Sequence, residues 1–278
     1  MRVLSLPFQG RSLGCSLASL RSLALTTAGV GAMLIGLSMM PALAQQAGTS
    51  PENTAAVRFI DAIENAAVPE QSEISNALVA LVPENPKTIW DASGTSPRVR
   101  MVTWMSESSF QRFWAEPATL PTDKTAPPSW GVIWVTPAPQ VQEFCKALPG
   151  DAEAVHTRLK EYLGLAPDRS YARFVEILIA PENLRRPCPD PEVTDTTCGL
   201  TLANDLESDY RAWFLGNYAN AYGVTGAPWT RLGYTYDWVA ADGSASGNRP
   251  VGASEYILTG NAPYSIVGRY TTAEYCGR

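Results

Sequence analysis

The chain has 278 residues, of which 17% are charged, and a formal net charge of −6 with a single histidine. This acidic balance disfavours nucleic acids and anionic membranes as partners. One histidine excludes zinc centres built from two or three histidines, and it leaves His156 as the one base for a serine–histidine or cysteine–histidine mechanism. The place of His156 on a predicted amphipathic helix favours a packed or solvated side chain instead.

The first 44 residues have the pattern of a secretory signal peptide. They contain three arginines and no acidic residue, then the apolar run Leu23–Met40, and then Pro41–Ala44 directly before Gln45. Small residues at this point predict cleavage after Ala44 and a periplasmic or secreted location. A membrane anchor is the alternative, since the apolar run has roughly the length that spans a bilayer.

Removing these 44 residues from 278 leaves 234, with 18 basic residues against 27 acidic ones and a net charge of −9. Nothing after residue 44 is long and apolar enough for a transmembrane helix. We therefore expect a soluble protein with no membrane insertion after removal of the signal peptide.

Four cysteines follow the leader, and an even number in an exported chain predicts two disulfides. Three pairings are possible. Cys188 with Cys198 closes a short loop rich in Pro, Asp and Thr, which leaves Cys145 with Cys276 and would pin the end of the chain to a helix. A cysteine metal site is the alternative, but no Cys-x-x-Cys spacing occurs.

Residues 45–97 are predicted as an N-terminal helical segment and residues 98–278 as the main domain. A first helix is expected over Asn53–Ala67, and a second over Glu73–Leu81, which Ser72 can cap and a proline ends. All eight tryptophans come after residue 89, so we expect the core to begin there and these helices to form an outer layer.

Hydrophobic periodicity predicts mixed strands and helices through the first part of the main domain. Alternating or continuous apolar runs indicate strands at 98–104, 130–136 and 171–179, and helical spacing indicates helices at 106–114, 137–148 and 151–165. Residues 181–199 are predicted as an irregular connection.

One more helix and three strands are predicted for the rest of the chain. The helix covers Asp205–Tyr222 and ends at a glycine. The strands lie at 232–239, 255–258 and 264–270, and they can pair as neighbours without crossover helices. The predicted fold class is therefore α+β, with a mixed, largely antiparallel sheet flanked by helices and two disulfides.

Phosphate-binding and dinucleotide-binding motifs of the glycine-rich kind are absent, and the sequence leaves any cofactor unknown. Asp190, Glu192 and Asp195 crowd the Cys188–Cys198 loop, where three carboxylates can gather around calcium. Turn formation between prolines, with two adjacent arginines as counter-charges, is the favoured interpretation, and no metal site is predicted.

Tyr234, Tyr236 and Trp238 alternate along the predicted strand 232–239, so they share one face of it. If these rings line a groove, their flat apolar surfaces and polar groups would bind a small molecule, a glycan or a protein. As core residues they would only pack, and general burial statistics favour the core.

Asp237 and Glu255 each lie on a predicted strand among these aromatic residues. A pair of carboxylates can hydrolyse glycosides without any histidine. These two are the pair that we would test first for such an activity.

The tail also resembles a known family of enzymes. The strand Ser254–Leu258, the turn Gly260–Ala262 and the following Tyr-Ser-Ile-Val are similar to the glutamate strand of ADP-ribosyltransferases and related NAD glycohydrolases. The resemblance implies that Glu255 holds the nicotinamide ribose as the catalytic acid, and that Arg231 clamps the dinucleotide phosphates. Arg231 lies closer to Glu255 in sequence than in that family, and the Ser-Thr-Ser strand of the family is not evident between them.

These features together predict an exported globular protein that serves as a binding or structural module of the periplasm or extracellular space. The alternative is a histidine-independent enzyme with its site on the C-terminal strands. Its chemistry would be that of an NAD glycohydrolase or ADP-ribosyltransferase, or that of a carboxylate-pair glycoside hydrolase.

Overall fold

The structure is a computed structural model that describes residues 51–94, 96–223, 225–239 and 250–278. The predicted signal peptide and its cleavage site lie outside these residues. All described residues belong to one compact unit that covers residues 48–278.

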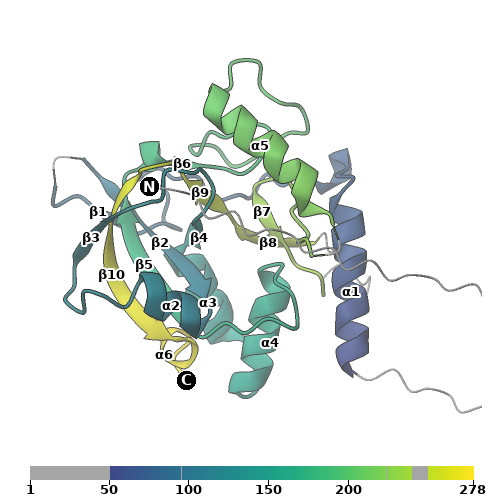
Figure 1. Cartoon of the computed structure of the whole chain (residues 1–278), viewed down its shortest axis with the longest axis horizontal. Helices are drawn as coiled ribbons and strands as arrows, with labels where there is room; N and C mark the ends of the chain where they lie inside the picture. The colour runs from purple at the N-terminus through teal and green to yellow at the C-terminus, as the bar shows by residue number, and fades with distance from the viewer. Residues whose placement is uncertain (1–50, 95, 224, 240–249) are drawn as a thin grey trace, which may run out of the picture. The chain divides into compact units, whose positions relative to one another are not determined.

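An eight-stranded sheet forms the centre of this unit (Figure 1). Its strands follow the order β3-β10-β5-β2-β4-β9-β6, with β1 paired to β2, and every pair is antiparallel. The bounds are β1 Trp90–Asp91, β2 Arg98–Met105, β3 Thr122–Thr125, β4 Trp134–Pro137, β5 Arg173–Ile179, β6 Leu184–Arg185, β9 Tyr256–Leu258 and β10 Pro263–Thr271. The three longest strands, β10, β5 and β2, are neighbours, so the middle of the sheet joins segments that are far apart in the sequence.

A second sheet contains β7 (Tyr234–Tyr236) and β8 (Val251–Ser254). Glu255 alone separates β8 from β9, so the chain passes from the small sheet to the large sheet at this residue. The backbone N–H of Glu255 still donates to the carbonyl of Gly233, at 3.1 Å. This hydrogen bond to the small sheet therefore fixes the position of the Glu255 backbone.

The two faces of the large sheet are covered by different elements. Helices α3 (Ala138–Ala147) and α6 (Thr272–Tyr275) pack against the face that carries Trp104 and Phe174. Phe110 of α2 (Glu107–Phe113) belongs to the larger core on the opposite face. Helix α4 (Ala152–Tyr162) extends from the first of these layers to contact β7.

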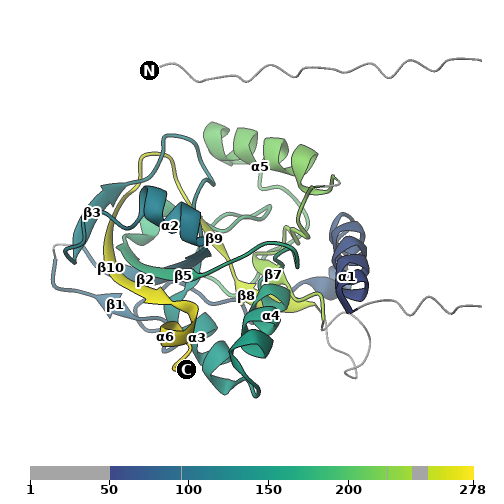
Figure 2. The ribbon, with the colours of Figure 1, turned by 60° about the horizontal axis from the view of Figure 1, so that its bottom comes forward.

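Helices α1 (Pro51–Ala66) and α5 (Ser208–Ala221) lie at the small-sheet end (Figures 1 and 2). Phe59 and Ile63 of α1 pack against aromatic side chains of the β7 segment. Tyr210 and Phe214 of α5 pack against Trp229 and against Ile257 of β9.

The predicted helix Glu73–Leu81 is wrong. Only a 3₁₀ turn forms, at Gln71–Glu73, and residues 78–81 are irregular and buried. The backbone N–H groups of residues 78 and 81 donate to carbonyls of residues 196 and 193, and that of residue 79 donates to a serine of β8. Bonds to distant segments thus replace the local helical bonds, and the main core includes Leu81 rather than beginning after residue 89.

The predicted neighbour pairing of the last three strands is also wrong. Strand β7 pairs with β8, β9 pairs with β4 and β6, and β10 pairs with β3 and β5. The backbone N–H groups of Thr259 and Asn261 donate to the carbonyls of Asn183 and Pro127, so this link is tied to other segments instead of forming a hairpin. The hairpin in the resemblance to ADP-ribosyltransferases is therefore not present.

Both predicted disulfides are present with the predicted partners. Cys145 of α3 is bonded to Cys276, across 131 residues, and Cys188 is bonded to Cys198, across 10 residues. All four side chains are buried. The predicted α+β class with two disulfides is confirmed, and the bridges fit a protein of an oxidising compartment such as the periplasm or the extracellular space.

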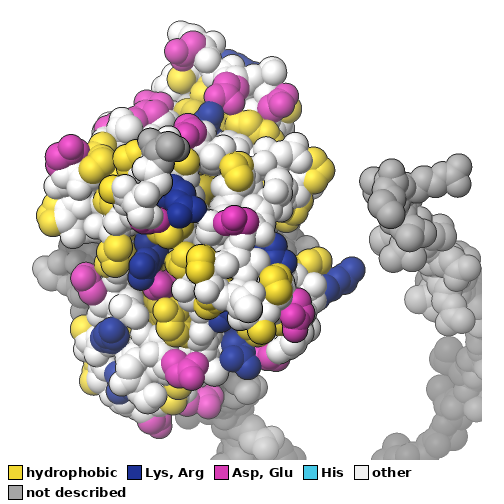
Figure 3. Space-filling view, turned by 90° about the vertical axis from the view of Figure 1, so that its left-hand side faces the viewer, with side chains coloured by type: hydrophobic (Ala, Val, Ile, Leu, Met, Phe, Trp, Pro, Cys, Tyr) yellow, Lys and Arg dark blue, Asp and Glu magenta, His cyan; other side chains and the backbone are white. Residues whose placement is uncertain are grey.

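Among the residues that the structure describes, no helix has the length and apolar character needed to cross a membrane. Figure 3 shows the surface on the side where β1, β3 and β10 lie in Figure 1. Basic, acidic and hydrophobic side chains are interspersed there, and neither sign of charge gathers in one large patch. This face therefore has no charge pattern that would select a strongly charged ligand.

Candidate functional site

The three tail aromatics are core residues, the interpretation that burial statistics favoured over a binding groove. Tyr234, Tyr236 and Trp238 are 1%, 3% and 3% exposed. Their polar atoms are used internally: the hydroxyls donate to Glu73 O and Asn65 Oδ1, at 2.8 and 2.9 Å, and the indole N–H donates to a carbonyl of the segment after α4. Because both rings and polar atoms are occupied by protein, these residues offer no surface to a ligand.

Asp237 is buried in an ion pair. Its carboxylate accepts two hydrogen bonds from the guanidinium of Arg158, at 2.9 Å from Nη1 and 2.5 Å from Nη2. This bidentate pair ties the small sheet to α4. The arrangement gives Asp237 a structural role and leaves its oxygens occupied.

Asp237 and Glu255 leave the small sheet at different points. The backbone N–H of Asp237 bonds to Pro250 and that of Glu255 bonds to Gly233, four residues before Asp237 on the same strand segment. Four residues of strand correspond to about 13 Å. Glycoside hydrolases use two carboxyl groups that act on one bond, whereas Asp237 is paired with Arg158 and its charge is not among the causes that raise the pKa of Glu255.

Arg231 has a left-handed backbone, with φ of 57°, and its guanidinium faces two tyrosines of the α5 region. Its Cζ lies 4.4 Å from the ring centre of Tyr218 and 5.5 Å from that of Tyr222, and its Nη2 donates to the carbonyl of Ala67 at 2.8 Å. These cation–π contacts and the hydrogen bond hold α1 and α5 together. No ion pair joins Arg231 to Glu255 in the described part of the chain.

Glu255 is the most unusual titratable group near these residues. Its side chain is 7% exposed, and its Oε1 atom is buried with no hydrogen-bond partner among the described residues. Burial raises the pKa of Glu255 to about 8, because the charged form loses its hydration. The carboxyl group is close enough to raise the pKa values of Tyr210 and Tyr222 through its charge, although burial is the main cause for both tyrosines.

A cluster of half-buried tryptophans surrounds this part of α5. Trp130, Trp134 and Trp213, here called the tryptophan cluster, gather around the buried Trp229 and Tyr210. The ring centres of Trp134 and Trp213 are 5.9 Å apart, and that of Trp130 is 6.0 Å from Tyr210. These rings come from the turn before β4, from β4 itself and from α5, so only the tertiary fold assembles them.

The indole N–H groups of the tryptophan cluster have no hydrogen-bond acceptor among the described residues. The buried indole of Trp229, by contrast, donates to the carbonyl of Pro187 at 3.0 Å. An indole nitrogen can only donate, so each member of the cluster keeps a donor that no described residue accepts, although the Nε1 atom of Trp213 packs against Gly131. Such surfaces suit a ligand that has both apolar faces and hydrogen-bond acceptors.

The sequence did not predict this cluster. A strand was predicted over 130–136, whereas β4 begins at Trp134 and Trp130 lies in a turn. Trp213 lies on the predicted helix Asp205–Tyr222 and is only partly buried. A signal was present in the uncharged stretch 212–223, since a helix without charges on its outer side is unusual for a solvated surface.

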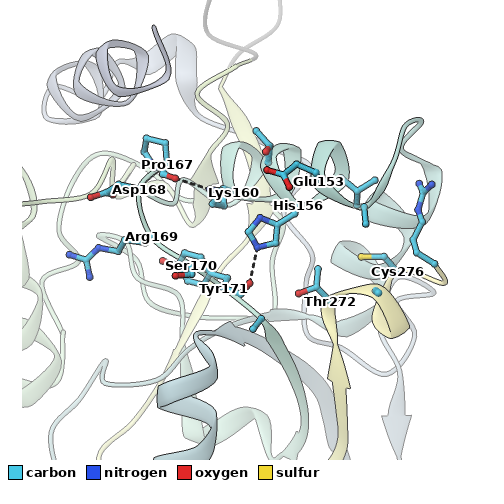
Figure 4. Close-up of a pocket in the computed structure, with 16 residues that line it drawn as sticks. Glu153, His156, Lys160, Pro167, Asp168, Arg169, Ser170, Tyr171, Thr272 and Cys276 are labelled. Carbon is cyan, nitrogen blue, oxygen red and sulfur yellow. Dashed lines mark hydrogen bonds between the residues drawn. The ribbon is translucent and has the colours of Figure 1, made fainter. Parts of the chain in front are cut away.

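A cavity of about 570 Å³ opens beside α4 (Figure 4). Its walls are α4, the segment 167–172 and the α6 region, and His156 lies between the first two. The Nε2 atom of His156 is 2.7 Å from the carbonyl of Tyr171, so this nitrogen carries the proton and donates. The imidazole also packs edge-on against Trp104, and the single histidine is therefore held in place by protein contacts, as the sequence favoured.

The acidic loop between Cys188 and Cys198 is partly compensated by the adjacent Arg186, which pairs with Glu192 and Asp195. Arg186 is fully buried there, and its guanidinium donates to Asp195 Oδ1 at 2.5 Å. Glu192 accepts hydrogen bonds from two backbone N–H groups of its own loop. Within the described residues, no group of three acidic, histidine or cysteine side chains is arranged to hold a metal ion.

No protein-family model, no curated protein and no solved structure gives a significant match to this chain. The fold and the side-chain arrangement therefore carry the functional argument alone.

Proposed function

We propose that this protein is an exported binding module that takes a neutral glycan on the tryptophan cluster. The observation that carries the proposal is the set of three half-buried indoles whose N–H groups have no acceptor among the described residues. Sugar rings have apolar faces that stack on aromatic rings, and their hydroxyl oxygens accept hydrogen bonds.

The charges beside the cluster support an uncharged ligand. The guanidinium of Arg185 lies over the ring of Trp130, with Cζ 5.7 Å from its centre. The same guanidinium is paired with Glu207 at 2.6 Å, so its charge is already compensated. A neutral ligand matches this surface better than an anion or a cation does.

Export is the second part of the proposal. It is supported by the leader that ends at Ala44 and by two disulfides that would not persist in a reducing cytosol. The test is peptide mapping of the protein from its native host. We expect Gln45 at the N-terminus and all four following cysteines oxidised; an intact leader with reduced thiols would contradict export.

The glycan is tested by isothermal titration calorimetry with cellohexaose, maltohexaose and chitohexaose. At least one should bind saturably, and its affinity should not fall in high salt, because no ion pair is involved. Trp134→Ala and Trp213→Ala should each weaken binding about tenfold, the value of one aromatic contact. Absence of binding by all three sugars at millimolar concentration would overturn the glycan assignment.

A matched control separates the indole donor from the ring. Trp134→Phe and Trp213→Phe keep an aromatic face and lose the N–H, so both should weaken binding. Trp90→Phe removes an indole whose N–H already bonds to Thr88 Oγ1, at 2.8 Å. This variant should bind like the parent protein, and equal losses in all three variants would indicate a nonspecific effect.

A histidine-independent enzyme is the second candidate function, and Glu255 is the observation that favours it. Strongly perturbed carboxyl groups gather at catalytic sites, and this one is buried without a hydrogen-bond partner for Oε1 among the described residues. The test is incubation with NAD and measurement of released nicotinamide, with Glu255→Gln as the control. Absence of turnover, or equal turnover in the variant, would eliminate this candidate.

A further inference from the structure

The α4 cavity is separate from the tryptophan cluster, and its walls share no residue with that cluster. Its volume of about 570 Å³ is within the usual range of small-molecule sites. Tyr171, Ala273 and Cys276 provide apolar surface, while α4 and the segment opposite provide charged side chains (Figure 4). A ligand of this cavity therefore needs both apolar and charged parts.

The charges that are available to a ligand are balanced. Glu153, Asp168 and Arg169 have no ion-pair partner among the described residues. Lys160 donates one hydrogen bond to the carbonyl of Pro167, at 2.7 Å, and keeps two N–H groups for other acceptors. The guanidinium of Arg278 is used by the carbonyls of residues 148 and 150. Two acids and two bases remain, which matches a zwitterion.

The spacing along α4 sets the length of this ligand. Glu153, His156 and Lys160 follow one another at helical intervals of three and four residues, so they lie on one face of the helix. The acid and the lysine are seven residues apart, which corresponds to about 10 Å along the axis. An extended peptide of about three residues has this length.

We propose that the α4 cavity binds a short peptide with free termini, with its ammonium group at Glu153 and its carboxylate at Lys160. His156, fixed by Tyr171 between these two residues, faces the middle of the peptide. Asp168 and Arg169 lie at the rim of the cavity, and their side chains point away from His156. The apolar surface of the cavity receives small side chains.

The experiment is calorimetry with trialanine and its two blocked forms, N-acetyl-trialanine and trialanine amide. Trialanine should bind, and each blocked form should bind about tenfold more weakly or worse, because it loses a charge-assisted hydrogen bond. Dialanine should also bind more weakly, since it cannot reach both groups. Absence of trialanine binding at about 10 mM, or equal binding of the blocked forms, would overturn the proposal.

Two variants should each remove the preference for one free terminus of the peptide. Loss of a purely structural contact would not produce this result. Lys160→Met should make binding insensitive to amidation of the peptide while sensitivity to acetylation remains. Glu153→Gln should do the reverse, and Glu153 is exposed, so this arm holds even if the lysine variant fails to fold. The exposed Lys87→Met serves as the control and should behave like the parent protein.

This site and the tryptophan cluster can fail independently. Trp134→Ala should leave trialanine binding unchanged, and Glu153→Gln should leave oligosaccharide binding unchanged. Variants that lost both ligands together would contradict the separation of the two sites.

Discussion

The molecule contains two groups of large aromatic residues that look alike in sequence and differ in their polar contacts. In the buried group, Tyr234, Tyr236 and Trp238, each polar atom has a hydrogen-bond acceptor in the protein. In the tryptophan cluster, the indole N–H groups have none among the described residues. Burial of an unpaired donor costs free energy, so an aromatic residue with an unused donor is more informative about binding than aromatic content alone.

The largest expected effect is a difference in the free energy of unfolding between variants of the buried group and variants of the tryptophan cluster. Trp238→Ala should lower the free energy of unfolding by about 4 kcal/mol, because it leaves a large cavity against α1. Trp134→Ala should cost less, about 2 kcal/mol, since that ring is only partly buried. Urea denaturation followed by circular dichroism measures both. Equal losses would erase the distinction between core and surface aromatics.

Glu255 lies between the two groups, and it should make stability depend on pH. Its pKa is raised by burial to about 8 from the ordinary 4.5, so the native state keeps a proton that the unfolded chain releases. Stability contributed by this group is therefore complete below about pH 4.5 and is lost as pH rises toward 8. The loss should be about 3 kcal/mol between pH 5 and 7.5.

Glu255→Gln tests this dependence directly, because glutamine cannot ionise. Relative to the parent protein, the variant should become more stable as pH rises through this window. Chemical denaturation at several pH values measures the difference. A difference that stays constant from pH 5 to 8 would show that Glu255 does not retain its proton.

Asp237 should show that the buried group depends on an ion pair as well as on packing. Asp237→Asn leaves the Arg158 guanidinium without its bidentate partner, and the expected cost is about 2 kcal/mol. This value allows for the 28% exposure of the arginine side chain. In a double-mutant cycle with Arg158→Met, the two losses should not add. Additive losses would mean that the pair contributes no coupling.

The smallest expected effect concerns the indole N–H groups of the two sets of aromatic residues. Trp213→Phe should change stability by no more than about 0.5 kcal/mol, because its N–H has no acceptor among the described residues. Trp238→Phe removes a donor that bonds to Leu165 O, at 3.3 Å, and should cost about 1 kcal/mol. Comparison of the two melting curves, with an aromatic ring kept in each variant, measures the combined cost of the lost donor and the smaller ring. A larger loss for Trp213 would place its N–H in the fold rather than at a binding surface.

Elements with strong local signals were predictable. Helices α1, α3, α4 and α5 and strands β2 and β5 follow from apolar residues at helical or strand spacing. The disulfide pairing followed from cysteine spacing, since residues 188 and 198 can close a short loop. The segment 73–81 failed because its backbone bonds to residues 193–196 and to β8, and such partners leave no trace in a local pattern.

The candidate site could be predicted only in part. Glu255 stood out as an acid among aromatic residues, but its burial and its closeness to Tyr210 of α5, another part of the chain, appear only in the fold. Arg231 and Asp237 were expected near it as functional groups, whereas one holds two helices together and the other pairs with α4. The tryptophan cluster was missed because its members belong to three different elements.

The sequence by itself determined which residues could cross-link, several of the helices and strands, and that the chain has the leader pattern of an exported protein. Those properties depend on residue types and on spacing along the chain. Only the tertiary structure decided which aromatic residues are buried with satisfied donors and which acid lies without a partner for one of its oxygens. Burial and hydrogen bonding are set by segments that are distant in sequence, and the order of strands in the sheet is what brings those segments together.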